Sequence, residues 1–442
     1  MGIPKTATPT QHPTPQPPRL PARAATTPHV EATAPIRLPD HARILVVKAA
    51  GLGDLLLALP AIRALRQTYP QARIDLLCAP PGAALVRESP LIDHVWTVDK
   101  TRFDSPHASF GALLGAPRQA LALGGLALRL RQARYDAVLL LHHLTLPFGR
   151  VKYRLLLAAA RPALAAGLDN GHGAFLDLRV PDAGFGARHE AAYCLDVARA
   201  VGARLPDAPD APDAPPAPRL ADLGWDDIEI ARAGAPPTHA EPLVALHVGS
   251  GTYSVARRWP LNRFVALAHA LHGELGARIV LIGGDDERAL VAEAAQALGA
   301  PPWVAVSAPG ATLRETAAHL SRCDLFVGND AFPMHLAAAA GTPVLAIFGP
   351  SNAPAWRPLP RDARAVVSVV RRDLPCSPCF YRGHELGTPQ GCPPRPCLED
   401  LPVAQVLREA RRMLARTRAA SAAPAGPPPA MPPATPHAER DG

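Results

Sequence analysis

The sequence contains no uninterrupted apolar run of the roughly 18 residues that a membrane-spanning helix needs. Its N-terminus also lacks a basic segment followed by an apolar stretch, which argues against a secretory signal. We therefore expect a cytoplasmic protein, whose 48% hydrophobic residues suit a soluble globular chain.

Aromatic residues are scarce as well. They make up 5% of the chain, and no stretch interleaves them with basic residues in the way that stacks nucleic-acid bases. The 46 Lys and Arg against 38 Asp and Glu give a net charge of +8. This mild excess is compatible with nucleic acid, an anionic membrane face or a phosphorylated substrate. Without the aromatic pattern, we expect no nucleic-acid partner.

Proline is abundant but unevenly placed. Of 53 prolines, 10 lie in residues 1–40, 6 in 206–218 and 7 in 421–442. Such Pro-rich tracts cannot bury enough apolar surface to offset the entropy of ordering. We predict disordered tails over 1–40 and 419–442 and a stiff linker over 206–240. The remaining segments, 41–205 and 241–418, are each long enough for a hydrophobic core.

Both segments alternate apolar runs with helical patterns. Strands are predicted at Arg43–Lys48, Arg73–Cys78, 94–98 and 135–142, and then at 242–248, 277–282, 323–328 and 342–348. Helices are predicted after the first strand and at 189–202, Leu261–Leu275, 286–298, 312–321 and 333–340. Repeated βα units imply parallel sheets with helices on both faces. Two such units predict a cleft between the carboxyl ends of the strands, where ligands of open α/β sheets bind.

The first strand ends at Gly51-Leu52-Gly53-Asp54, where a helix begins. Glycines permit a tight turn, and a helix N-terminus presents free N–H groups to an anion. The third glycine of a dinucleotide fingerprint would stand at Leu56, which counts against a nicotinamide cofactor. Asp54 could simply cap its helix, a role that does not exclude catalysis.

Two turns of the second half have a related composition. Ser250 and Gly251 follow strand 242–248, and Arg257 and Arg258 come shortly after, a pattern that suits a phosphate-bearing ligand or a flexible loop with solvated arginines. The second turn runs from Asn329 to His335. Pro333 fits a first helical turn there, main-chain N–H groups near it would face the cleft, and His335 could reach a phosphate.

Two clusters have more than one interpretation. Arg150, Lys152 and Arg154 have no acidic neighbour over 149–161, so they would attract an anionic acceptor or merely form a solvated helix face. Four of the seven cysteines, Cys376, Cys379, Cys392 and Cys397, lie within 22 residues at a spacing that permits structural zinc. Disulfides, which a reducing cytoplasm disfavours, and free thiols are the alternatives. Cys78, Cys194 and Cys323 lie in apolar runs and are predicted to be core residues.

Four segments of the chain, in the order expected for the family, resemble glycosyltransferase family 9, which is best known for the lipopolysaccharide heptosyltransferases. They are KAAGLGDLLLALPAIRALRQTYP, RRWPLNRF, GNDAFPMHLAAAAGTPVLAIFGP and the CSPC…C…CL ending, within about 43–407. The resemblance implies a GT-B architecture, with two Rossmann-like domains facing a central cleft. The acceptor domain would be 41–205, and the nucleotide-sugar domain 241–418, with the Cys-rich loop 376–397 and a C-terminal helix.

The resemblance also implies an inverting reaction that needs no metal, with Asp54 as the general base. The donor is expected to be ADP-heptose, bound by Ser250, Gly251, Arg257, Glu287, Asp330, Pro333, Met334 and His335. The acceptor is expected to be a lipid-linked inner-core saccharide, bound by Gly53, Arg150, Lys152 and Arg154 at the inner face of the cytoplasmic membrane.

The chain departs from the family pattern at two positions. Phe332 stands where family members usually have Gly, and Arg257 where Lys is more usual. Two alternatives to the transferase therefore stay open at this point: a catalytically inactive protein that binds a nucleotide-sugar, and an NAD-dependent Rossmann enzyme.

Overall fold

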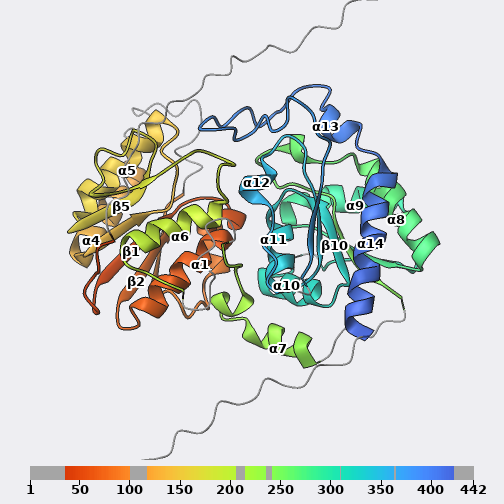
Figure 1. Cartoon of the computed structure of the whole chain (residues 1–442), viewed down its shortest axis with the longest axis horizontal. Helices are drawn as coiled ribbons and strands as arrows, with labels where there is room; N and C mark the ends of the chain where they lie inside the picture. Colours follow the sequence, from red (N-terminus) through yellow and green to blue (C-terminus); the bar gives the residue numbers. More distant parts are fainter. Residues whose placement is uncertain are drawn as a thin grey trace, which may run out of the picture.

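The computed structural model describes residues 35–99, 117–205, 215–234, 241–308, 310–362 and 365–422. They form two lobes, each built on a parallel sheet of six strands (Figure 1). The predicted tails lie mostly outside the described residues, which begin at 35 and end at 422. No described helix is long and apolar enough to cross a membrane.

The first sheet has the strand order β3-β2-β1-β4-β5-β6. After β3 the chain returns to the other side of β1, so the strand order reverses between β1 and β4, where ligands of such folds bind. The sequence predicted the first four strands but neither β5 nor β6. The strands are β1 (Arg43–Lys48), β2 (Arg73–Cys78), β3 (His94–Thr97), β4 (Ala137–Leu140), β5 (Leu164–Asp169) and β6 (Leu178–Pro181).

The helices of the first lobe cover both faces of this sheet. They are α1 (Leu52–Thr68), α2 (Pro80–Leu85), α4 (Pro117–Ala133), α5 (Pro147–Ala160) and α6 (Glu190–Ala200). Every residue of α1 from Leu55 to Leu65 is buried. A helix that is apolar on all sides is expected to be buried on all sides, and α1 contacts α6 of its own lobe and α11 (Phe332–Ala339) of the other.

The second sheet has the strand order β12-β11-β10-β7-β8-β9, which places the reversal between β10 and β7. The sequence predicted four of these six strands. The strands are β7 (Leu243–His247), β8 (Arg278–Ile282), β9 (Val304–Val306), β10 (Leu325–Asn329), β11 (Val344–Ile347) and β12 (Val367–Val370). Besides α11, the helices are α8 (Leu261–Leu275), α9 (Arg288–Ala297), α10 (Leu313–Ser321), α12 (Ala353–Trp356), α13 (Pro396–Glu399) and α14 (Val403–Ala422).

The segment predicted as a linker, 206–240, is partly folded. It contains the 3-10 helix η2 (Leu220–Leu223) and the helix α7 (Asp226–Gly234). Leu220, Leu223 and Trp225 are buried. The buried carboxylate of Asp222 pairs with Arg63 of α1 at 2.5 Å. The prolines of 206–218 hid this short apolar segment, which anchors the connection to the first lobe.

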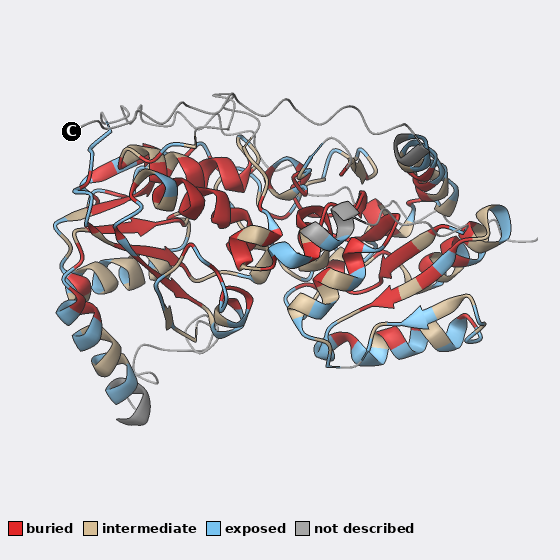
Figure 2. Ribbon diagram, turned by 90° about the horizontal axis from the view of Figure 1, so that it is seen from below, coloured by how far each residue is buried: buried red, intermediate tan, exposed pale blue. Residues whose placement is uncertain are grey.

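The lobes meet through a shared apolar core. One cluster of buried side chains includes Leu55 and Ile62 of α1 together with Met334 and Leu336 of α11. Buried residues fill the centre of both lobes in Figure 2. The first turns of α1 and α11, which follow the central strands of the two sheets, are thereby brought together.

Candidate active site

A cavity of about 1080 Å³ lies between the lobes. Its lining includes residues that follow β1 and β4 in the first lobe and β7 and β10 in the second. Both points of strand reversal therefore face one cavity. Most of the predicted site residues line it: Gly53, Asp54, Lys152, Ser250, Gly251, Arg257, Glu287, Asp330, Pro333 and His335.

Asp54 lies in the first turn of α1 and contacts the opposite lobe. Its Oδ1 accepts a hydrogen bond from Nε1 of Trp356 in α12, at 3.1 Å. The N-cap position belongs to Gly51, and no side chain caps this helix. The carboxylate is thus held across the cavity rather than used as a helix cap. Trp356, which the sequence analysis did not single out, contacts the rings of Phe185 and Tyr381.

Gly53 allows the two lobes to approach closely. A Cβ atom at this position would lie 3.1 Å from Cδ2 of His335 and 3.8 Å from Cα of Phe332. The first of these distances is shorter than an ordinary van der Waals contact. A side chain at position 53 would therefore press the first turn of α1 against that of α11.

His335 is buried in the first turn of α11. Burial and the neighbouring His189 lower the pKa of its imidazole to about 3, although Asp54 acts in the opposite direction. Its Nδ1 has no hydrogen-bond partner among the described residues. His335 is therefore a neutral ring with an unused polar atom beside the cavity.

Asn329 organises the loops on the second lobe's side of the cavity. Its Nδ2 donates to the carbonyls of Val248 at 3.1 Å and Gly249 at 2.9 Å. Its Oδ1 accepts from the backbone N–H of Trp259 at 2.9 Å. One buried side chain thus joins the end of β10 to the end of β7 and to the RRWP segment. The sequence analysis placed Asn329 in the turn that ends at His335 but did not predict it as a site residue.

The adjacent residues Arg257 and Arg258 differ in their hydrogen-bond partners and in their position relative to the cavity. Arg258 donates from Nε to Oγ of Ser250 at 3.2 Å and from Nη2 to the carbonyl of Gly251 at 3.1 Å. Arg257 donates to the carbonyl of Ser250 at 3.0 Å, and its Nη1 lies 3.4 Å from Oδ2 of Asp330. Its buried Nε has no partner among the described residues. Arg257 lines the large cavity and Arg258 does not, so Arg257 is the arginine placed to meet a ligand there.

Glu287 supports the loop that follows β7. Its Oε1 accepts from the backbone N–H of Gly251 at 2.7 Å, and its Oε2 lies 2.8 Å from Nε2 of His247. Burial raises the pKa of this carboxyl, but the hydrogen bonds from His247 and Gly251 outweigh burial and lower it to about 2. A Cβ on Gly249 would lie 1.9 Å from Oε1, so this arrangement requires glycine there.

Neither Pro333 nor Met334 provides a ligand with an unpaired backbone N–H group. Pro333 has no N–H, and the N–H of Met334 donates to the carbonyl of Ala331 at 3.2 Å. The side chain of Met334 belongs to the buried core. Of the predicted first-turn residues, His335 is the one whose side chain lines the cavity with an unused polar atom.

A buried charge cluster lies on the first lobe's side of the cavity. The ring nitrogens of His143 are 2.8 Å from Asp182 and 2.8 Å from Glu190. Burial alone would lower the pKa of His143, but Glu190 and Asp182 raise it to about 9. Lys48 completes the cluster, with its Nζ 2.9 Å from the carbonyl of Leu141 and 4.0 Å from Glu190. His143, Glu190 and Lys48 line the cavity.

The structure does not gather the three basic residues of α5 at one point. Arg150 donates to the carbonyls of Leu144 at 2.9 Å and Thr145 at 2.8 Å, which fixes the turn before α5. Lys152 lies over the ring of Phe148 and lines the cavity. Arg154 lies over the ring of Phe175 and does not line it.

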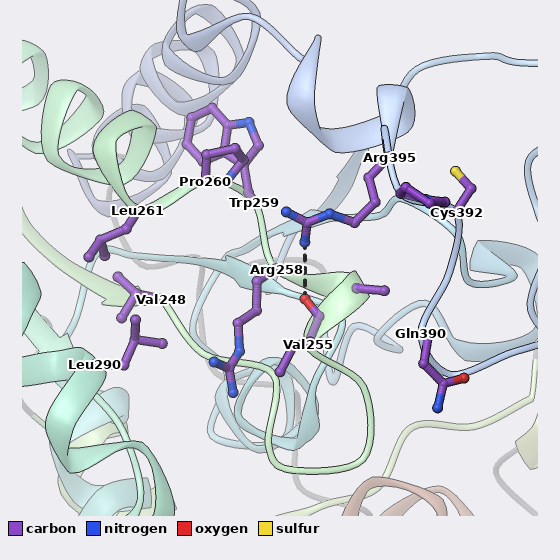
Figure 3. A pocket seen from close by; sticks show the side chains of 12 residues that line it. Val248, Val255, Arg258, Trp259, Pro260, Leu261, Leu290, Gln390, Cys392 and Arg395 are labelled. Atoms are coloured by element: carbon purple, nitrogen blue, oxygen red, sulfur yellow. Dashed lines mark hydrogen bonds between the residues drawn. The ribbon is translucent and has the colours of Figure 1, made fainter.

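The Cys-rich loop packs on the RRWP segment. Arg395 donates to the carbonyl of Val255 at 3.3 Å, and Cys392 and Arg395 line a second cavity of about 400 Å³ with Arg258 and Trp259 (Figure 3).

The four cysteines of the loop are free thiols, of which Cys397 is buried. Among the described residues, no group of three or more His, Cys, Asp or Glu side chains is placed to hold a metal ion. Structural zinc therefore stays a prediction. Cys78, Cys194 and Cys323 are buried.

Two Rossmann-like lobes whose points of strand reversal face one cavity define a GT-B fold. The chain belongs to glycosyltransferase family 9, the heptosyltransferase family, whose sequence model matches residues 125–388.

Among curated proteins, the chain is 26% identical to lipopolysaccharide heptosyltransferase 2 of Salmonella typhimurium, over 73% of this chain and 87% of that protein. It is 37% identical to lipopolysaccharide heptosyltransferase 3 of Escherichia coli over 102 residues, which are 23% of this chain and only 29% of that protein.

Solved structures show the same fold. The E. coli ADP-heptose lipopolysaccharide heptosyltransferase II superposes with a TM-score of 0.58 at 22% identity, over 85% of this chain and 99% of that chain. E. coli heptosyltransferase WaaC with ADP gives a TM-score of 0.60 at 19% identity, over 84% of this chain and 99% of that chain.

Proposed function

We propose that this glycosyltransferase moves a heptose from ADP-heptose to a lipid-linked saccharide of the lipopolysaccharide inner core, with inversion at the anomeric carbon. The observation that carries the proposal is that Asp54 of one lobe lines the same cavity as Arg257, Asp330 and His335 of the other. The similar proteins named above are lipopolysaccharide heptosyltransferases, and one of the similar structures contains ADP. The acceptor is met at the inner face of the cytoplasmic membrane.

The proposed chemistry is a single displacement. The acceptor hydroxyl oxygen attacks the anomeric carbon of the heptose while the bond from that carbon to the diphosphate oxygen breaks on the opposite face. Asp54 takes the hydroxyl proton as general base, and the electron pair of the broken bond leaves with ADP. The hydrogen bond from Trp356 holds the carboxylate in one orientation for this transfer.

Negative charge that develops on the diphosphate is stabilised by Arg257. Its guanidinium lines the cavity and is already oriented, because Nη2 donates to the carbonyl of Ser250 and Nη1 lies near Asp330. Glu287 positions the loop around Ser250 and Gly251. On this proposal it acts through the loop, because both of its oxygens are already engaged.

The first test identifies the donor. Purified protein is incubated with a panel of nucleotide-sugars and a delipidated inner-core acceptor, and the released nucleoside diphosphate is identified. We expect ADP from ADP-heptose, with a glycosylated product. Donor binding without product would support an inactive binding protein instead. Thermal shifts with ADP, UDP and NAD provide a second measurement, since only a true ligand stabilises the fold by mass action.

The second test removes the base. Asp54→Asn is expected to lower turnover by a factor of about 10³ or more while leaving the thermal shift with ADP unchanged. Asp285→Asn, at an exposed carboxylate on the second lobe, is the matched control. An Asp54→Asn variant that keeps most of its turnover would remove Asp54 from this role.

We also propose that the reaction needs no metal, because Arg257 supplies the positive charge that a divalent cation would otherwise provide. Initial rates in excess chelator are expected to equal those without it. Metal analysis of the purified protein separately tests the zinc prediction for the four cysteines. Strong inhibition by the chelator would show that the proposed role of Arg257 is insufficient.

A further inference from the structure

Helices α4 and α5 expose an unusual concentration of large apolar side chains. They lie side by side at the outer end of the first lobe (Figure 1). Nine large hydrophobic side chains are exposed among the described residues, and five of these belong to α4, α5 or the residue just before α5. Single exposed apolar residues are ordinary, whereas a cluster marks an interaction surface. The five are Leu121 (76% exposed), Leu128 (58%), Leu146 (54%), Val151 (42%) and Leu155 (53%).

The same surface is basic. Each of the two helices has three Arg or Lys residues in its sequence, and neither contains an Asp or Glu. Arg129, Arg131 and Arg154 are exposed. Exposed leucines beside exposed arginines are typical of helices that lie on an anionic membrane surface.

Helix α14 is a useful contrast. It is rich in arginine too, but its apolar residues Val406, Ala410 and Met413 are buried in the core of the second lobe. It also contains Glu409, which pairs with Arg412 at 2.5 Å. Positive charge is therefore present on both lobes, while its combination with exposed leucines is a property of α4 and α5.

The apolar surface is continuous with the candidate active site. The cavity that contains Asp54 is also lined by Leu123, Leu126 and Leu130 of α4 and by Phe148 and Leu156 of α5. A molecule held at this surface would have an apolar route to the base. A water-soluble acceptor would gain nothing from such a lining.

We propose that the surface formed by α4 and α5 docks the protein on an anionic lipid bilayer. Its leucines enter the interface, and its exposed Arg129, Arg131 and Arg154 face the acidic headgroups. A second copy of the chain fits less well, because a symmetric contact would bring two basic faces together. The inference rests on the proposed function, in which the membrane carries the acceptor. It adds that α4 and α5 form the surface of the protein that contacts this membrane.

The test uses the full chain and vesicles. Wild-type protein is expected to co-sediment with vesicles that contain one quarter phosphatidylglycerol, and at least about tenfold less with pure phosphatidylcholine, since each Arg or Lys adds to the attraction. The double variant Leu128→Asp/Val151→Asp and the double variant Arg129→Glu/Arg131→Glu are each expected to lose about tenfold or more of the anionic binding. Val306→Asp and Arg408→Glu, at exposed positions of the second lobe, are the matched controls and should bind as wild type does.

Three outcomes would overturn the proposal: equal binding to neutral and anionic vesicles, wild-type binding by both double variants, or a dimer in solution that the α4–α5 substitutions dissociate. Activity on the delipidated acceptor separates this proposal from the proposed function. Leu128, Val151, Arg129 and Arg131 do not line the cavity, so their variants should keep that activity and their thermal shift with ADP. Loss of all transfer by wild-type protein would instead count against the proposed function.

Discussion

The second lobe surrounds its half of the cavity with polar groups that hydrogen-bond one another, whereas the first lobe surrounds much of its half with apolar side chains. Asn329, Glu287 and Arg258 fix the loops of the second lobe through their hydrogen bonds to the backbone. In the first lobe, leucines of α4 and aromatic residues of α5 line the space. Fixed polar groups suit a small charged donor, and an apolar wall suits a large amphiphilic acceptor.

The largest effect is expected from removing Arg257, the arginine that lines the cavity from the second lobe. Arg257→Ala is expected to lower kcat by a factor of about 10² to 10³, the usual cost of losing one group that stabilises transition-state charge. Arg257→Lys, which restores the residue more usual at this position, should recover part of the loss. Steady-state kinetics at saturating acceptor would measure both, and an equal loss in the exposed control Arg288→Ala would contradict the assignment.

The second substitution disturbs the loop that follows β7 without removing a charge. Gly249→Ala would place a methyl group where the carboxylate of Glu287 lies, so Glu287 must move and release Gly251. We expect donor affinity to fall about tenfold, the worth of one charge-assisted hydrogen bond. Gly273→Ala is the matched control, because nothing lies within 4 Å of a Cβ there and alanine favours the helix. Calorimetric titration with ADP would compare the two.

A smaller effect is expected at the contact between the lobes. Trp356→Phe removes the N–H that donates to Asp54 but keeps an aromatic ring beside Phe185 and Tyr381. One such hydrogen bond is worth about 1 kcal/mol, so kcat should fall less than about tenfold with an unchanged KM for the donor. A changed KM with constant kcat would indicate that Trp356 acts on the donor instead.

The last prediction concerns stability rather than rate. Because folding raises the pKa of His143 to about 9, its imidazolium stabilises the fold fully below the unfolded pKa of about 6.5, and this stabilisation declines as pH rises through about 9. His143→Gln should therefore lower Tm near pH 6, with a smaller difference from wild type near pH 10. Thermal unfolding across this range would show it, and the exposed His41→Gln should show no such trend.

The sequence predicted structure best where a local residue pattern determines it. Strands Arg43–Lys48 and Arg73–Cys78 were predicted with the observed bounds because they are short apolar runs between clear turn signals. Strands β6 and β9 were missed because they have four and three residues and stand at sheet edges, where a continuous apolar pattern is not required. Turns rich in Gly, Asp and Pro located the loops that face the cavity.

Contacts that depend on packing were not accessible to sequence reasoning. His143 and Glu190 are 47 residues apart, and Asp54 and Trp356 are 302 apart, so no spacing connects either pair. Glu287 was predicted as a ligand-binding acid, yet only the structure shows that both of its oxygens are engaged by His247 and Gly251. Most of the site residues named in the sequence analysis line the cavity, and the arrangement of the lobes determines which of their polar groups are already hydrogen-bonded.

The hydrogen bond between Trp356 and Asp54 has a consequence for side reactions. If the lobes separated, the carboxylate would lose the N–H that orients it at the moment when bulk water gained entry. On the proposed function, water beside a bound nucleotide-sugar would then meet a poorly aligned carboxylate. Wasteful hydrolysis of the donor would be slowed in the open form and excluded by steric closure in the shut one.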